Sequence, residues 1–449
     1  MKKTVLIFMV LCFVLCGCGK KSGPEYKIED GHIVYSAGGE PQIDNAADTV
    51  GVEGSADNEG RAVFANEEYN SIASEDSGRV SELRNNLNTA ASACAEIYAA
   101  ADKGEGVNVS LSYQTIAEMM AAIANAGFSV ADSTNSVNMQ GYHSMDEFGK
   151  STMQPGNVSG KYFIIYPDGH LSAFELYREG QVWHLLSMSG AWNEDNTIRI
   201  FSEGRYAVHS LEYTEKGWLI YSRDTSDFDE NQKSNNGSYT MVRVLPYDAK
   251  LRSLATQYVE PIGYLENNLF ITDWTNANFG PVDFNTLYAY LFGMYNGTEM
   301  LSSYNVRNYY KSVAGTRLYL VPAQTFEDVV QNWFEIDSSA LKAISDYSFA
   351  RGGYFFLGYN RDYFNVTPRT PEPEVVAYTE NSDGTITMTV DAVNTWYGTD
   401  RAFRHILTVR PEKGGFKFIS NSLVADENSI LPEQKLAAMT DVEISKIKG

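Results

Sequence analysis

The architecture of this chain is indicated by residues 161–187, which read KYFIIYPDGHLSAFELYREGQVWHLLS. Short runs rich in aromatic and β-branched residues are separated here by Pro167-Asp168-Gly169 and by Glu179-Gly180. Glycine adopts positive φ at little cost, so both separators predict tight turns. The segment therefore predicts antiparallel strands joined by hairpins, rather than strands that alternate with helices.

The same pattern continues to about residue 245. Two more turns are predicted at Glu203-Gly204 and at Glu215-Lys216-Gly217. The strands predicted beyond the opening stretch are Thr197–Phe201, Tyr206–Tyr213, Trp218–Arg223 and Ser238–Val244. So many short strands in succession predict an antiparallel meander, a sandwich or part of a propeller.

Helical patterns flank this meander. Apolar residues spaced by three and four positions predict a helix over residues 79–102, and Ser112 is placed to cap a second helix that ends near Gly127. Beyond the meander, helices are predicted over residues 248–259, 284–295, 326–334 and 339–347.

The last predicted element is another antiparallel sheet, recognised from strict alternation over residues 385–392. Ile386, Met388, Val390 and Ala392 lie on one face, and Thr385, Thr387, Thr389 and Asp391 lie on the other. We therefore expect one buried and one solvated face. The predicted fold is α+β, with N-terminal helices, a central antiparallel β meander, and C-terminal helices followed by a curled antiparallel sheet.

Composition narrows the classes of partner. The chain has 449 residues, of which 43% are hydrophobic, and its net charge is −22, from 35 Lys and Arg against 57 Asp and Glu. The apolar content is too high for a wholly disordered chain. The acidic balance repels phosphate backbones, so we expect no nucleic-acid partner.

The N-terminus has the features of a bacterial lipoprotein signal. Lys2 and Lys3 precede an apolar run, which ends in Leu15-Cys16-Gly17-Cys18. This tetrapeptide looks like a lipobox, in which Cys18 receives a diacylglyceryl lipid and the peptide is cut before it. Two acyl chains hold a protein stably on a membrane. The sequence therefore predicts export and lipid anchoring on the outer face of the cell membrane.

These signals predict the following order along the chain. Residues 1–17 form the signal peptide, and 18–78 form the lipidated Cys18 with a disordered acidic tether. Residues 79–245 form a domain of helices and β meander, 246–424 form an α+β domain, and 425–449 form a C-terminal tail. Cys94 is the one cysteine beyond the lipobox, and its place on the apolar helical face predicts a buried thiol.

Several residue clusters suggest chemistry, but each has a simpler explanation. Asp224, Asp227 and Asp229 offer oxygen ligands at which calcium could bind, yet the loop lacks the glycine and the closing glutamate of an EF-hand. Ser339 and Lys342 match the Ser-x-x-Lys spacing of serine acyl-enzymes, without that family's partner motifs. No other catalytic or metal motif occurs, so we expect no catalytic residues, no enzymatic activity and no cofactor apart from the lipid.

Four stretches resemble an uncharacterised family of clostridial-type surface lipoproteins. They are VEPIGYLENNLF at 259–270, FNTLYAYLF at 284–292, PEVVAY at 373–378 and WYGTDR at 396–401. The resemblance covers roughly residues 80–424. It implies a lipid-anchored envelope protein of a Gram-positive anaerobe, and it assigns no function or catalytic residue.

Three functional hypotheses follow from these features. The first is a noncatalytic module at the cell envelope that binds a wall component, a small ligand or an envelope protein. The second is a solute-binding lipoprotein of a transporter, although such proteins are usually doubly wound. The third is a cell-wall hydrolase, which rests on acidic residues and Ser339 alone.

Overall fold

The computed structural model describes residues 26–29, 32–35, 77–104, 109–180, 182–223, 239–297, 310, 312, 318–357 and 370–432. Contacts within the chain divide it into two units, Met1–Ala65 and Asn66–Gly449. In the first unit, β1 (Tyr26–Glu29) and β2 (His32–Tyr35) pair as an antiparallel hairpin. The remaining elements belong to the second unit.

A seven-stranded sheet forms the first half of this second unit, and its spatial order is β3-β4-β5-β6-β7-β8-β9. Its strands are β3 (Ser129–Asp132), β4 (Ser159–Ile165), β5 (Leu171–Glu179), β6 (Val182–Trp192), β7 (Ile198–Tyr213), β8 (Trp218–Arg223) and β9 (Tyr239–Arg243). β3 pairs with β4 in parallel, and each later strand pairs antiparallel with its predecessor. The sequence order of the strands is therefore also their spatial order, as in a meander.

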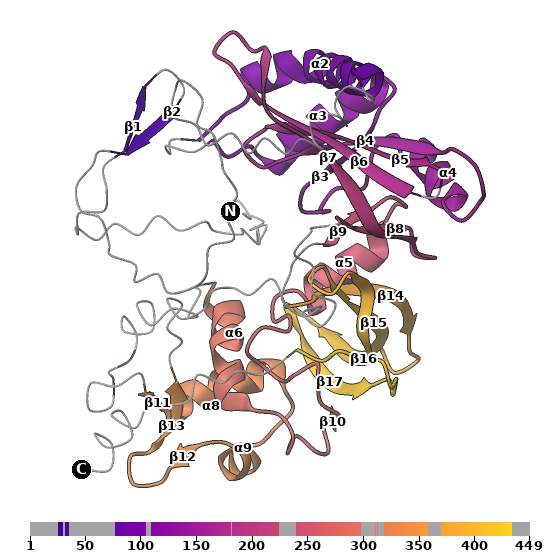
Figure 1. Ribbon diagram of the computed structural model, residues 1–449. Helices are drawn as coiled ribbons and strands as arrows, with labels where there is room; N and C mark the ends of the chain where they lie inside the picture. The colour runs from indigo at the N-terminus through magenta and orange to yellow at the C-terminus, as the bar shows by residue number, and fades with distance from the viewer. Residues whose placement is uncertain are drawn as a thin grey trace, which may run out of the picture. The chain divides into compact units, whose positions relative to one another are not determined.

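Helices pack on both faces of this sheet around β4 (Figure 1). Phe163 and Ile165 of β4 pack with α2 (Ser77–Ala100) and α3 (Tyr113–Asn125). Tyr162 and Ile164 project from the opposite face and pack with α4 (His143–Ser151). The two sets alternate because successive side chains of a strand point to opposite faces. β4 is consequently a central strand that is buried on both sides.

The second half contains two further sheets and most of the remaining helices. The five-stranded sheet has the order β10-β17-β16-β15-β14, and the three-stranded sheet has the order β11-β13-β12. The helices are α5 (Ala249–Tyr258), α6 (Phe284–Asn296), α8 (Ala323–Trp333) and α9 (Ser338–Ile344). The strands are β10 (Trp274–Thr275), β11 (Leu318–Pro322), β12 (Tyr347–Ser348), β13 (Gly353–Leu357), β14 (Glu372–Glu380), β15 (Ile386–Asn394), β16 (Thr399–Glu412) and β17 (Gly415–Leu423).

Aromatic side chains dominate the core of this second half. Phe334 lies 5.8 Å from Trp274, 5.1 Å from Phe284 and 5.3 Å from Phe418, measured between ring centroids. These separations are typical of favourable aromatic pairs. The cluster joins the segment before α6 to the end of α8 and to β17, so it fixes the helices on the five-stranded sheet.

The predicted α+β fold is confirmed, including the capping of α3 by Ser112, whose Oγ accepts a hydrogen bond from the Thr115 backbone N–H at 3.1 Å. The predicted turn at Glu203-Gly204 is wrong, because β7 runs unbroken from Ile198 to Tyr213. Gly204 pairs with Ser187 of β6 in this ladder. Long pairing with β6 thus overrides a local turn signal. The small elements β3, α4 and β10 to β13 were not predicted.

Cys94 of α2 is fully buried in the apolar cluster between the helices and the sheet, as predicted. Burial raises the pKa of its thiol to about 12, so the reactive thiolate is not populated at neutral pH. Among the helices in the described ranges, none has the length and apolar character needed to cross a membrane.

We predict that Gly160→Ala destabilises the protein by about 1–3 kcal/mol, the usual cost of overpacking a core. A Cβ atom at position 160 would lie 2.4 Å from Cγ of the Phe148 ring, which packs in the α4 face of the sheet. Gly415→Ala is the matched control, since a Cβ there meets nothing within 4 Å. Urea unfolding monitored by tryptophan fluorescence measures both. Equal stability of the two variants would contradict the packing described for β4 and α4.

Candidate functional site

Two buried carboxylates lie side by side where the seven-stranded and five-stranded sheets meet. Glu374 of β14 is 5% exposed and Asp391 of β15 is 0% exposed. The two residues face each other in the antiparallel register, and Asp391 in turn faces Arg404 of β16. Like charges at directly opposed positions repel, and buried charges need partners. Among the described residues Arg404 forms its ion pair with Asp391, so the cations that pair with Glu374 come from outside its sheet.

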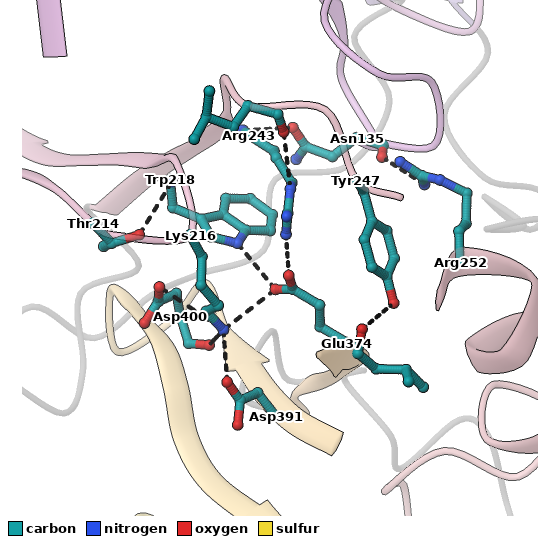
Figure 2. A network of polar contacts seen from close by, with 12 residues as sticks. Asn135, Thr214, Lys216, Trp218, Arg243, Tyr247, Arg252, Glu374, Asp391 and Asp400 are labelled. Carbon is teal, nitrogen blue, oxygen red and sulfur yellow. Dashed lines mark hydrogen bonds and ion pairs between the residues drawn. The ribbon is translucent and has the colours of Figure 1, made fainter. Parts of the chain in front are cut away.

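The seven-stranded sheet supplies these cations. Lys216, in the turn between β7 and β8, extends its Nζ to 3.3 Å from Glu374 Oε2 and 3.0 Å from Asp391 Oδ2. Its Nζ also donates to the backbone carbonyl of Asp400 at 2.5 Å. Arg243, the last residue of β9, donates from Nη1 to Glu374 Oε1. Figure 2 shows both cations reaching down to the carboxylates of the five-stranded sheet.

The remaining polar atoms at this junction are also satisfied. Trp218 Nε1 donates to Glu374 Oε2 at 3.1 Å. Arg404 binds Asp391 through two hydrogen bonds, from Nε at 2.6 Å and from Nη2 at 3.0 Å. Asp400 Oδ2 lies 3.8 Å from Lys216 Nζ. The cations of Lys216, Arg243 and Arg404 therefore balance three carboxylates. This set of six charged residues with Trp218 is called the junction network below.

A structured loop after β3 lies next to the junction network. Asp132, which ends β3, is buried and accepts hydrogen bonds from the backbone N–H groups of Thr134, Ser136 and Val137. Asn135 adopts a positive φ of 53° within this loop. Its side-chain oxygen accepts from the backbone N–H of Arg243 at 3.1 Å. The loop is thus tied to the same residue that pairs with Glu374.

Asn138 fixes the loop to the segment that leads into α5. Its Nδ2 donates to the Tyr247 carbonyl at 3.0 Å, and its Oδ1 accepts from the Tyr247 backbone N–H at 2.9 Å. The Tyr247 hydroxyl donates to the carbonyl of Val375 at 3.0 Å. Burial, followed by the charge of Glu374, raises the pKa of Tyr247, so its phenol remains a neutral donor.

Arg252 of α5 completes this arrangement. It donates from Nη1 to the Asn135 carbonyl at 3.2 Å and from Nη2 to Asn138 Oδ1 at 2.8 Å. Its guanidinium carbon lies 4.9 Å from the centroid of the Tyr247 ring, within cation–π distance. Figure 2 shows Arg252 extending from α5 toward Asn135 beside Tyr247. Neutral oxygens and an aromatic ring therefore hold its positive charge in place.

An open pocket of about 600 Å³ lies between this loop and α5. Most of its lining residues carry a polar group, which is a hydroxyl, an amide, a phenol or the guanidinium of Arg252, while their carbon atoms provide the larger share of the pocket surface. The lining residues are Tyr113, Ser136, Val137, Asn138, Gln140, Tyr247, Ala249, Arg252, Ser253, Thr256 and Gln257. Those from α5 recur every three or four positions, so one face of the helix forms one wall.

Of the residues singled out from the sequence, those that the structure describes do not line this pocket. Leu15, Cys16, Gly17 and Cys18 lie outside the described residues, and so do Asp224, Asp227 and Asp229. Lipid attachment and calcium binding therefore stay predictions. In the described ranges, no three His, Cys, Asp or Glu side chains gather in a way that would hold a metal ion.

Ser339 and Lys342 are not arranged as a nucleophile and its base. The Ser339 hydroxyl donates to Asp337 Oδ1 at 2.5 Å, at the N-terminal cap of α9. The Lys342 ammonium lies 3.1 Å from Glu327 Oε1. Both residues therefore have capping or ion-pair partners that explain their positions.

The expectation that Asp391 lies on a solvated sheet face is wrong. Alternation holds through Val390, but Asp391, Ala392 and Val393 are all buried. Solvent exposure of this face of β15 ends at Asp391, because the side chains of Lys216 and Arg404 cover its carboxylate. The available signal for a buried carboxylate was an acidic residue within an apolar stretch. Glu374 directly precedes Val375-Val376, and Asp391 lies between Val390 and Ala392. No local pattern indicated which cations would pair with these two carboxylates.

His405 of β16 follows Arg404 directly in the sequence. The structure places its ring in the core, where Nε2 lies 2.9 Å from the Tyr264 hydroxyl and Nδ1 lies 2.6 Å from Asn421 Oδ1. It also stacks on Phe270 at 5.3 Å. Burial lowers the pKa of His405 to about 4.

We predict that Glu374→Gln costs about 3–5 kcal/mol of stability, the usual penalty for removing one partner of a buried ion pair. The change leaves Arg243 and Lys216 without a full counter-charge at nearly the same side-chain volume. Glu380→Gln is the matched control, on the exposed end of the same strand, and should change stability by less than about 0.5 kcal/mol. Urea unfolding compares them, and similar small effects of both variants would refute the junction network as a stabilising contact.

We also predict a pH dependence from His405. The folded pKa of about 4 lies below the ordinary 6.5, so the unfolded chain binds the proton more readily. His405 therefore makes stability fall as pH drops from about 6.5 to 4, by an amount on the order of 3 kcal/mol.

The measurement is urea unfolding from pH 4 to 7.5 on wild type, His405→Gln and the exposed control His209→Gln. His405→Gln should be less stable at pH 7 and show a flatter profile, because the other titrating groups are common to all three proteins. A wild-type slope that survives in His405→Gln would contradict the assignment.

A model of a family of unknown function, DUF6070, matches residues 81–436. This range includes the seven-stranded, five-stranded and three-stranded sheets, the junction network and the pocket, as well as the four stretches that carry the resemblance. Comparisons with curated proteins and with solved structures give no match. The matched range covers most of the 449 residues, and the chain therefore belongs to this family of unknown function.

Proposed function

We propose that the protein is a lipid-anchored, noncatalytic binding protein on the outer face of the cell membrane, and that the pocket beside α5 is its binding site. The observation that carries the binding role is the polar lining of this pocket, held by hydrogen bonds before any ligand arrives. Asn138, Tyr247 and Arg252 are joined to one another by such bonds. Preorganisation of this kind reduces the cost of binding.

The chemistry of the lining favours binding over catalysis. The lining residues include serine, threonine and tyrosine hydroxyls but no carboxylate, imidazole, thiol or amine that would activate one of these hydroxyls as a nucleophile. They do offer many hydrogen-bond donors and acceptors, together with two tyrosine rings. These groups suit recognition of a small polar molecule, such as a fragment of the cell wall.

The anchoring half of the proposal rests on the lipobox at Leu15-Cys16-Gly17-Cys18 and on the resemblance to surface lipoproteins. The alternatives receive less support. The sheets are antiparallel apart from the β3–β4 pair, whereas transporter-linked solute-binding proteins are usually doubly wound. A wall hydrolase based on Ser339 would need a base near that hydroxyl, and Asp337 occupies it as a cap.

We predict that Cys18→Ser abolishes lipid labelling and releases protein from cells into the medium. The thiol of Cys18 is the acceptor of the diacylglyceryl group, so a hydroxyl at this position removes the anchor. Cells are fed an alkyne fatty acid, and membrane and medium fractions are analysed by immunoblot. Cys16→Ser, two residues earlier, is the matched control and should remain labelled and membrane-bound. Wild-type labelling of Cys18→Ser would refute the anchor.

A further inference from the structure

We propose that the pocket beside α5 recognises the carboxylate of a small sugar acid, and that Arg252 pairs with this carboxylate. The inference rests on the proposed binding function and names the class of ligand. It starts from the way in which Arg252 is held, because an arginine side chain has five N–H donors and a permanent positive charge.

Arg252 uses two of its five N–H donors within the protein. Its two hydrogen bonds go to neutral oxygens of Asn135 and Asn138. In the part of the chain that the structure describes, no carboxylate forms an ion pair with Arg252, although its charge acts on Glu260 at a greater distance. Arg243 and Arg404, by contrast, each bind a buried carboxylate. Arg252 therefore offers a fixed cation with three further N–H donors at a pocket wall.

A cation of this kind is selective for planar anions. The guanidinium fork matches the two oxygens of a carboxylate, and charge-assisted hydrogen bonds are stronger than neutral ones. The chain as a whole has a net charge of −22, so most of its surface repels anions. A carboxylate ligand is therefore drawn to a local site such as Arg252 and not to the surface in general.

The rest of the lining suits a hydroxylated ring. Ser253 and Thr256 are exposed on the same face of α5, nearly one helical turn apart. Gln140, on the opposite loop, donates to the Asn138 carbonyl at 3.1 Å and retains its side-chain oxygen as an acceptor. Tyr113 is 49% exposed, and its hydroxyl donates to the Ser136 carbonyl at 3.2 Å. Its ring is thus a fixed apolar surface on which a sugar can stack.

The size of the pocket is consistent with this class. Small-molecule sites usually enclose about 300–1,000 Å³, and this pocket encloses about 600 Å³. That space accommodates one or two sugar rings. Two sources supply such a carboxylate, muramic acid released from the cell wall after its peptide has been removed and free uronic acids, and they differ in where the acid is attached to the ring.

The test is isothermal titration of the full-length protein, purified in detergent, with two matched pairs of probes. N-acetylmuramic acid is compared with N-acetylglucosamine, and glucuronate is compared with glucose. Each pair differs mainly by the presence of a carboxylate. We expect at least one acid to bind at least about tenfold more tightly than its neutral partner, and the acid that binds identifies the source.

Arg252→Gln should weaken acid binding at least about tenfold while leaving any neutral sugar binding unchanged. Arg351→Gln, which removes the same charge from an exposed site outside the pocket, is the matched control. Because Arg252 also supports the loop, a second variant, Ser253→Trp, obstructs the pocket from the solvent side of α5. It should weaken binding with unchanged urea stability.

Several results would overturn the inference. If acid and neutral sugars bind equally tightly, and Ser253→Trp abolishes the binding of both, carboxylate recognition is rejected. The proposed binding function then stands. Acid binding that persists in both Arg252→Gln and Ser253→Trp would place the site elsewhere. If none of the four probes binds at about 10 mM, sugar acids are rejected as the ligand class. The proposed binding function would be rejected separately, by a finding that no ligand of the protein is displaced or weakened by Ser253→Trp.

Discussion

The buried pair of carboxylates at Glu374 and Asp391 is the constraint on which the second unit depends. Adjacent strands place the two negative charges opposite each other in the interior, and burying charge without partners costs several kcal/mol per ion. The five-stranded sheet supplies only Arg404, which pairs with Asp391. Lys216 and Arg243 must therefore come from the seven-stranded sheet, so neither sheet satisfies its charges alone.

The same constraint shapes the candidate site. Arg243 binds Glu374 through its side chain and Asn135 through its backbone N–H. Asn135 and Asn138 then hold Arg252 on α5, and Tyr247 reaches from the pocket to the carbonyl of Val375, next to Glu374. One continuous chain of polar contacts thus runs from the junction network to the pocket wall. It orders the wall without using the charge of Arg252 in an ion pair.

Local patterns predicted the fold well and the site poorly, for a physical reason. Turn glycines, the Ser112 cap and alternation in β15 depend on residues close in sequence, and such patterns predicted most of the helices, the meander and the final sheet. The Glu203-Gly204 turn failed because pairing with β6 outweighed it. Glu374 and Lys216 are 158 positions apart, and Arg252 lies 117 positions from Asn135. The fold brings such pairs together, and the only local sign of them in the sequence is an acidic residue within an apolar stretch.

The most direct test of this account is a crystal structure of the protein grown with the sugar acid that binds most tightly in solution. We expect density for the ligand between α5 and the loop after β3. Its carboxylate oxygens should lie about 2.7–2.9 Å from nitrogens of Arg252, the usual length of such a charge-assisted bond. A ligand bound elsewhere, or bound in this pocket with its carboxylate turned away from Arg252, would contradict the account.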